Sequence, residues 1–257
     1  MTSSTLSPSS TCAIVTGHTR GLGAALAADL LARGIRVLGL GRGTAAAPAG
    51  RPGAAFEQAV LDLGDTAAIE RWLASGALRA FTGDADCVLL INNAGTVEPI
   101  APCGTQDPAA IARAITLNVA APLMLANALA AHDAAKAGAG KRIVHISSGA
   151  SRHVYAGWSV YCATKAALDH HARAVTEDAP QGVSICSLAP GVIDTGMQAT
   201  IRSKSAEEFP MRERFEQLKQ NGQLATPEGA AQKIADYVLS DAFGSTPATD
   251  IREVASA

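Results

Sequence analysis

Aromatic side chains are scarce in this sequence and make up only 4% of its 257 residues. The hydrophobic fraction is nevertheless 48%, so the core must be built largely from Ala, Leu, Val and Ile. Such a composition suits buried parallel strands covered by alanine-rich helices. Because a chain of this length lies near the upper limit for one hydrophobic core, we expect a single α/β domain.

An excess of charge of either sign is also missing. The formal net charge is -2 at pH 7, and the sequence pI is about 6.3. This balance provides no basic surface for nucleic acid or for an anionic membrane. The expected partner is therefore a small molecule.

Features of exported and membrane proteins are lacking as well. The five cysteines are odd in number and form no C-x-x-C pair, which favours a reduced compartment. The first ten residues are rich in Ser and Thr and have no basic start followed by an apolar run, so a flexible tail is expected over residues 1–10. No stretch offers about 18 uninterrupted apolar residues. These observations predict a soluble, cytoplasmic protein.

Short β-rich runs alternate with stretches in which apolar residues recur at helical spacing. The alternation predicts a doubly wound, mostly parallel sheet flanked by helices, with ligands beyond the carboxyl ends of its strands. A seventh strand is expected near the C-terminus, where Pro247 interrupts the pattern. The other expected strands are residues 12–16, 35–40, 56–61, 87–91, 142–147 and 183–188, and the expected helices are residues 21–33, 66–80, 108–135, 160–178 and 227–239.

A glycine-rich turn follows the first strand and opens the first helix, with the sequence T-G-H-T-R-G-L-G over residues 16–23. Gly17 can adopt a turn conformation that is closed to other residues, and Gly21 lets the backbone approach a pyrophosphate. Gly23 permits close packing of helix against strand. In this strand–turn–helix setting the pattern predicts a Rossmann-type dinucleotide site, and the alternative is a plain tight turn.

The choice of dinucleotide depends on the end of the second strand. An NAD-specific enzyme is expected to place an acidic side chain there for the ribose hydroxyls, but this chain has Gly41. Arg42 follows with a planar guanidinium suited to a 2′-phosphate, and Arg20 in the glycine turn could supply a second cation. The pattern predicts NADPH/NADP+, and the alternative is two solvated surface arginines.

Tyr161 and Lys165 lie four residues apart in a predicted helix, so the phenol and the ammonium share one helical face. A phenol with its ordinary pKa of about 10 is a poor acid or base at neutral pH, and a nearby ammonium lowers that pKa. Tyr161 could then exchange a proton with a carbonyl or alcohol oxygen. Taken alone, the spacing is more typical of an ordinary amphipathic helix, and the neighbouring motifs decide the matter.

Two adjacent serines end the fifth strand, and the second of them precedes Tyr161 by thirteen residues. Adjacent side chains of a strand point to opposite faces, so only one serine should reach the site. Ser148 is the preferred candidate to hydrogen-bond a substrate oxygen, and Ser147 is the alternative.

Pro122 lies four residues after Asn118 in the predicted helix over residues 108–135. The proline ring cannot coexist with a regular hydrogen bond to the Asn118 carbonyl, so the helix should kink there and free that oxygen to hold water. The alternative is a kink with no role in proton transfer.

The order of these motifs resembles the short-chain dehydrogenase/reductase family from Ala13 to at least Thr195, with an N-N-A-G run over residues 92–95 as a further match. The resemblance implies that Asn118, Ser148, Tyr161 and Lys165 are catalytic and that Asn118 orders a water beside the lysine. It also implies that Asp62 contacts the adenine ring, although Asp62 could instead cap the next helix. The implied cofactor-binding residues are Gly17, Thr19, Arg20, Gly21, Leu22, Gly23, Arg42, Asp62, Leu63, Asn93, Ala94, Gly95, Tyr161, Lys165, Pro190, Gly191, Val192 and Thr195.

The runs G-W-S-V-Y-C over residues 157–162 and D-T-G-M-Q over residues 194–198 look like the branch of the family that contains sepiapterin reductase and benzil-type diketone reductases. That likeness implies an NADPH-dependent carbonyl reductase for a ketone or a vicinal dicarbonyl. Residues 195–225 are then expected to form a flap over the substrate, with a plain solvated helix as the alternative. The candidate substrate residues are Tyr155, Trp158, Met197 and Asp250, of which Trp158 could equally be core packing.

The resemblance further implies a homodimer or homotetramer, paired through the helices predicted over residues 108–135 and 160–178. One alternative function is an NAD(P)-dependent alcohol dehydrogenase of another branch. A second, from a different class, is an NADPH-sensing protein without turnover, which the presence of both Tyr161 and Lys165 disfavours.

Overall fold

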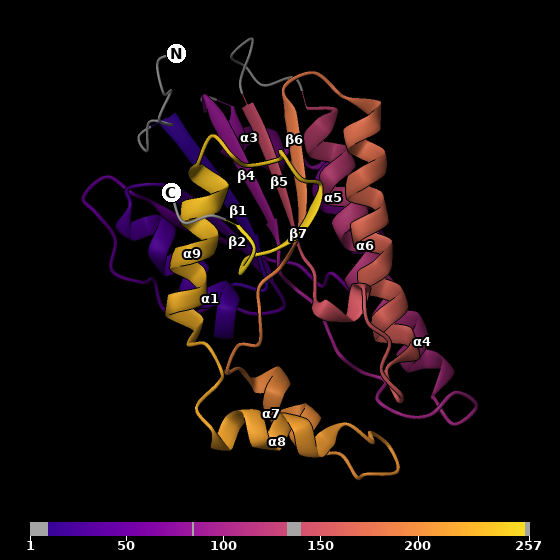
Figure 1. The fold of residues 1–257 in the computed structure, drawn as a ribbon. Helices are drawn as coiled ribbons and strands as arrows, with labels where there is room; N and C mark the ends of the chain where they lie inside the picture. The colour runs from indigo at the N-terminus through magenta and orange to yellow at the C-terminus, as the bar shows by residue number, and fades with distance from the viewer. Residues whose placement is uncertain (1–9, 84, 133–139, 255–257) are drawn as a thin grey trace.

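Seven strands form one sheet in the order β3-β2-β1-β4-β5-β6-β7, and every neighbouring pair is parallel (Figure 1). The computed structural model describes residues 10–83, 85–132 and 140–254, so nearly all of the predicted N-terminal tail lies outside the described residues. The strands are β1 (Thr11–Thr16), β2 (Arg36–Gly41), β3 (Phe56–Val60), β4 (Cys87–Asn92), β5 (Gly140–Ile146), β6 (Val183–Ala189) and β7 (Ala248–Asp250).

The predicted α/β fold is confirmed, and the six strands expected from the pattern agree with the structure to within two residues at each end. Pro247 precedes β7 instead of interrupting it. Its carbonyl accepts a hydrogen bond of 2.8 Å from the Ser187 backbone, which continues the pairing of β6 with β7. A proline is compatible with this position because only its carbonyl is used.

Helices cover both faces of the sheet. The helices are α1 (Gly21–Ala32), α2 (Thr66–Ala74), α3 (Ala77–Thr82), α4 (Pro108–Ile115), α5 (Ala121–Ala130), α6 (Ser159–Asp178), α7 (Gly196–Arg202), α8 (Arg212–Gln220) and α9 (Pro227–Leu239). One buried cluster joins α1 and α9 to the sheet, and a second joins the opposite face to α2, α3, α5 and α6.

Two predicted helices differ from the structure. The helix expected over residues 66–80 is divided into α2 and α3 because Gly76 between them has a left-handed φ of 79°. The helix expected over residues 108–135 ends at Ala130; residues 133–135 lie outside the described part of the chain. Within the helix expected over residues 108–135, a π-helical turn, Thr116–Ala120, separates α4 from α5.

The α4–α5 segment, Pro108–Ala130, is long and apolar enough to cross a membrane by length and composition, with a mean hydropathy of 1.6 in its most apolar window. The core helices of soluble proteins meet the same criterion, and a third of this window is buried inside the protein. The segment is therefore weak evidence for a membrane span.

Helices α7 and α8 lie beyond the carboxyl ends of the strands, at the bottom of Figure 1. They occupy most of the stretch predicted to form a flap. Their position places them over the edge of the sheet at which ligands of doubly wound folds bind.

Candidate active site

The glycine turn has the geometry of a close-approach loop. Gly17 and Gly21 have φ values of 69° and 55°, a region that favours glycine. A Cβ atom on Gly23 would lie 2.2 Å from the Gly17 carbonyl oxygen, so no larger residue fits there without a backbone shift. The turn therefore leaves room for a dinucleotide to approach the backbone and the start of α1.

Thr16 and Asn93 brace this turn from the end of β1 and the loop after β4. The Thr16 hydroxyl accepts hydrogen bonds of 2.9 Å from the backbone N–H groups of Asn93 and Ala94. The Asn93 side chain donates to the Thr16 carbonyl, also at 2.9 Å. Thr16 opens the glycine-rich motif but was not predicted as a site residue, because its hydrogen bonds join it to residues about 77 positions away.

The turn after β2 has room for a side chain larger than glycine and lies beside exposed arginines that can bind an anionic group. A Cβ atom on Gly41 would meet the His18 ring at 3.5 Å, an ordinary contact, so packing does not require glycine there. At Gly39, by contrast, the Cβ atom would lie 2.4 Å from that ring. The Arg20 and Arg42 side chains are both exposed at this edge of the sheet.

Asp62 does not cap the helix that follows it. Its carboxylate accepts a hydrogen bond of 2.8 Å from the Gly64 backbone in a tight turn. The N-cap of α2 is Asp65, which accepts from Ala68 at 3.1 Å. Asp62 is exposed whereas the neighbouring Leu63 is buried, so only the aspartate is accessible to a ligand.

The structure brings Ser148, Tyr161 and Lys165 together. The Ser148 hydroxyl accepts from the Ala150 backbone at 3.2 Å and is hydrogen-bonded to the Tyr161 phenol. The Lys165 ammonium lies 5.7 Å from the centre of the Tyr161 ring and donates a hydrogen bond of 2.7 Å to the Ile146 carbonyl. The spacing of four residues on α6 places both groups on its buried side.

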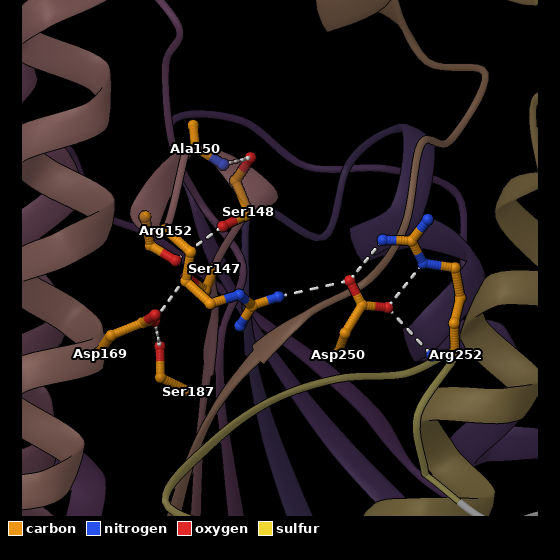
Figure 2. Close-up of polar contacts among 9 residues, drawn as sticks. Ser147, Ser148, Ala150, Arg152, Asp169, Ser187, Asp250 and Arg252 are labelled. Atoms are coloured by element: carbon orange, nitrogen blue, oxygen red, sulfur yellow. Dashed lines mark hydrogen bonds and ion pairs between the residues drawn. The ribbon is translucent and has the colours of Figure 1, made fainter. Parts of the chain in front are cut away.

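Ser147 points away from this group. Its hydroxyl donates to the Asp169 carboxylate at 2.7 Å (Figure 2). The two serines thus have different partners on α6, and Ser148 is the one that contacts Tyr161.

Burial dominates the electrostatics of the pair. Desolvation raises the pKa of Tyr161 to about 12, although the hydrogen bond with Ser148 acts in the opposite direction. Desolvation also lowers the pKa of Lys165 to about 8, against the favourable charge of Asp169. The expectation that the pKa of the phenol is lowered is therefore wrong, because loss of solvent raises it.

Asn118 lies in the middle of the π-helical turn, and Pro122 is the second residue of α5, the helix that follows this turn. The predicted irregularity in the helix is present, as a π turn instead of a sharp kink. The Asn118 amide accepts from the Thr96 backbone N–H and donates to the Thr96 carbonyl, both at 2.8 Å, and also donates to Thr164 at 3.2 Å. A Cβ atom on Gly95 would touch both Asn118 and Lys165, so the loop after β4 lies against both side chains.

Thr195 reaches the glycine turn from the loop after β6. A Cβ atom on Gly21 would lie 3.3 Å from the Thr195 methyl group. The loop that begins at Pro190 and includes Gly191, with a φ of 80°, thus returns toward the cofactor edge. Val192 is partly buried against the aromatic cluster around Tyr161.

An apolar roof covers Tyr161. Trp158 is 4% exposed, stacks on Phe209 with ring centres 4.6 Å apart and contacts Tyr161 edge-on at 5.2 Å. Tyr155 and Met197 pack against the same cluster but remain partly exposed. The structure therefore places Trp158 in the packing of the roof and leaves Tyr155 and Met197 as the accessible candidates at its rim.

Ion pairs attach the α7–α8 segment to the rest of the site. Lys204 pairs with Glu98 from the loop after β4 at 3.1 Å. Lys219 pairs with Asp194 at the start of the segment. Together with the buried Phe209 and Phe215, these contacts hold the segment against the loop after β4 and the aromatic cluster around Tyr161.

Asp250 does not present a free carboxylate. It is 1% exposed, and both of its oxygens accept hydrogen bonds from Arg252, at 2.8 and 2.7 Å. Arg152, from the turn after Ser148, approaches the same carboxylate at 3.5 Å (Figure 2). The proposed contact of Asp250 with substrate is therefore a poor fit to the structure, because two arginines already neutralise the group.

The residues at this edge fit a dinucleotide, given the cradle at Gly17 and Gly23, and comparison with known proteins supplies the family. Residues 11–206 match the profile described as short chain dehydrogenase. The chain belongs to this family of oxidoreductases, which bind a nicotinamide cofactor.

The similar proteins cover nearly the whole chain. A benzil reductase ((S)-benzoin forming) of Bacillus cereus is 33% identical over 90% of this chain and 94% of its own. A sepiapterin reductase of Meriones unguiculatus is 32% identical over 90% of this chain and 92% of its own. A crystal structure of a short-chain dehydrogenase/reductase from Burkholderia vietnamiensis is 49% identical with a TM-score of 0.68, and the match covers 97% of this chain and 100% of that one.

Proposed function

We propose that this protein is an NADPH-dependent carbonyl reductase that acts on a ketone or a vicinal dicarbonyl. The observation that supports this most directly is the buried Tyr161 phenol, which is hydrogen-bonded to Ser148 and lies near Lys165 under an apolar roof. A phenol with a pKa of about 12 is protonated at neutral pH, so it can act as the acid that reduction of a carbonyl requires.

Side chains of the protein carry out the proton transfer. When bound at the glycine turn, the nicotinamide cofactor supplies the hydride to the carbonyl carbon. Tyr161 donates its proton to the oxygen that becomes negative, and the Ser148 hydroxyl donates a hydrogen bond to the same oxygen. The Lys165 ammonium stabilises the phenolate that remains, and the roof keeps bulk water from the reacting groups.

The cofactor preference follows from the turn after β2. In the proposed complex, Arg42 and Arg20 contact the 2′-phosphate of NADPH, and no acidic side chain at position 41 repels it. An oxidative enzyme specific for NAD would instead benefit from a carboxylate at that position.

The double variant Gly41→Asp with Arg42→Ala is expected to reverse this preference. The new carboxylate accepts from the ribose hydroxyls and repels the phosphate, while space for its Cβ atom exists beside His18. The ratio of kcat/KM with NADPH to kcat/KM with NADH should fall by about 100-fold or more, which corresponds to roughly 3 kcal/mol. A parent enzyme that already prefers NADH would contradict the proposal for this turn.

The proposed substrates are compact dicarbonyls next to a flat ring. Tyr155 and Met197 offer partly exposed apolar surface at the rim of the roof. Because a second carbonyl makes the reacting carbon more electrophilic, such substrates should react faster than simple ketones. The names of the similar benzil reductase and sepiapterin reductase support this choice of substrates.

The proposal is tested by following the loss of NADPH absorbance with benzil, sepiapterin and an aliphatic ketone such as 2-octanone. We expect reduction of at least one of the first two compounds, with a higher kcat/KM than for the ketone. Oxidation of alcohols with NAD+ and no reduction of any carbonyl would favour the alcohol dehydrogenase alternative. Binding of NADPH without turnover in either direction would favour the sensor.

We also propose a homodimer or homotetramer in which α6 and the α4–α5 segment pair across a symmetry axis. Small exposed residues on α6, such as Ala163 and Ala166, would permit close approach of the helices. A monomeric mass in light scattering at micromolar concentration would argue against this assembly.

A further inference from the structure

Asp169 is a buried carboxylate that the reaction described above does not use. It lies on α6, four residues after Lys165, and is only 2% exposed. One of its oxygens, Oδ1, accepts hydrogen bonds from the Ser147 and Ser187 hydroxyls, both at 2.7 Å (Figure 2). Such short distances are typical of hydroxyl groups that donate to an ionised carboxylate.

These two hydrogen bonds join three elements of the site. Ser147 directly follows β5 and precedes Ser148, and Ser187 belongs to β6, whereas Asp169 itself belongs to α6, the helix that carries Tyr161. The spacing between the Ser148 hydroxyl and the Tyr161 phenol depends on how β5 lies against α6. A cross-link one residue from Ser148 therefore controls the geometry of the pair that contacts the substrate oxygen.

The charge of Asp169 also acts on the site. Among the described residues, no hydrogen bond reaches its second oxygen, Oδ2. The side chain lines a groove together with Ser151, Arg152, His170 and Arg173, and no direct ion pair to Asp169 is present in the described part of the chain. A buried negative charge that no direct ion pair neutralises acts over several ångströms, and it favours the charged form of Lys165.

The other groups around the ammonium do not replace this charge. On α6 it faces Tyr161, which is neutral at neutral pH, and on β5 it faces His145, whose pKa is lowered to about 3. The Gly95 backbone, in the loop after β4, and the Asn118 amide, in the π-helical turn, also lie close to it and are uncharged. Asp169 is therefore the negative group that favours the charged form of Lys165.

We propose that Asp169 is a positioning residue of this active site. It holds the Ser148 end of β5 at a set distance from Tyr161 on α6, and it keeps Lys165 charged in a buried place. The proposal rests on the reductase function above, because it assigns Asp169 to the same proton transfer. It concerns residues outside the four catalytic positions that the sequence motifs indicate.

The test compares Asp169→Asn with the parent. The amide retains the size of the side chain but loses the charge, so the Lys165 ammonium should titrate at a lower pH than in the parent. This is measured by NMR of ¹³C-labelled lysine side chains, with the Lys165 signal assigned from its absence in Lys165→Met. The kcat for benzil with NADPH should fall by about 10-fold to 100-fold, with little change in the KM for NADPH.

Two further variants separate the effects of charge and of position. Ser147→Ala keeps the carboxylate but removes the link to β5, so it should lower kcat while the titration of Lys165 stays that of the parent. Glu177→Gln is the matched control, because it removes an exposed carboxylate from the same helix. It should change neither kcat nor the titration.

A parental kcat and a parental Lys165 titration in Asp169→Asn would overturn the proposal, even if the variant melted at a lower temperature. If Asp169→Asn does not fold, the kcat of Ser147→Ala tests the positioning role instead. A parental kcat in that variant would overturn this role. A parent that reduces no carbonyl would instead refute the proposed function. The NMR titration would still show whether Asp169 supports the charge of Lys165.

Discussion

Replacement of Tyr161 by phenylalanine is expected to lower kcat for carbonyl reduction by about 10³-fold, the middle of the range for loss of a general acid. The ring is buried between Trp158 and the Lys165 ammonium, so phenylalanine keeps the packing and removes only the hydroxyl. The affinity for NADPH should remain close to that of the parent. Steady-state kinetics with benzil and fluorescence titration with NADPH measure the two quantities.

Tyr237→Phe is the matched control for this experiment. It removes a buried phenol from α9, on the opposite face of the sheet, and leaves the proton donor in place, so its kcat should stay near that of the parent. Turnover of Tyr161→Phe within tenfold of the parent would show that another group donates the proton.

Replacement of Lys165 by methionine is expected to have the second largest effect on turnover, a loss of about 100-fold or more, because the phenolate formed after proton transfer loses its counter-charge. NADPH should also bind less tightly, since the family resemblance places the ammonium at the nicotinamide ribose. A variant with unchanged cofactor affinity would contradict that second role.

The same substitution should change how stability depends on pH. The pKa of Lys165 is about 8 in the folded protein and 10.5 ordinarily, so below pH 8 the fold carries a buried ammonium at a cost of about 3 kcal/mol. This cost decreases between pH 8 and pH 10.5 and is absent above that range. Methionine has no charge at any pH. The stability of Lys165→Met relative to the parent should therefore be highest below pH 8 and should fall as the pH rises toward 10.

Urea denaturation at pH 7 and pH 10 measures this difference. The lost hydrogen bond to the Ile146 carbonyl lowers the stability of the variant at both values, so it does not affect the change between them. A difference that stays constant from pH 7 to pH 10 would mean that the pKa of the lysine is the same in the folded and the unfolded protein.

Features that depend on neighbouring residues could be predicted from the sequence. The conformations of Gly17 and Gly21 follow from one turn, and the shared face of Tyr161 and Lys165 follows from the helical period. The sheet could be predicted because its central strands β1 and β4 are apolar along most of their length, as buried parallel strands are. Pro122 indicated an irregular helix, because a missing N–H has a local effect.

Features that depend on distant residues could not be predicted. The sequence left Ser147 and Ser148 as alternatives, and the outcome depends on Asp169, which is 22 residues away from Ser147. The Asp250 carboxylate binds two arginines, and one of them, Arg152, is 98 residues away. The raised pKa of Tyr161 results from burial under the α7–α8 segment, and the polar pattern of that segment gave no sign of Phe209 as a fully buried residue.

The anchor of the Lys165 ammonium is the main-chain carbonyl of Ile146, not a side chain. Every amino acid at position 146 would present the same oxygen, so single substitutions there cannot remove this contact directly. The side chain at that position is free to vary with the demands of the core, provided that the strand keeps its register with β4 and β6. Genetic drift at this position can therefore proceed without loss of the lysine's partner, whereas an insertion or deletion within β5 would displace it at once.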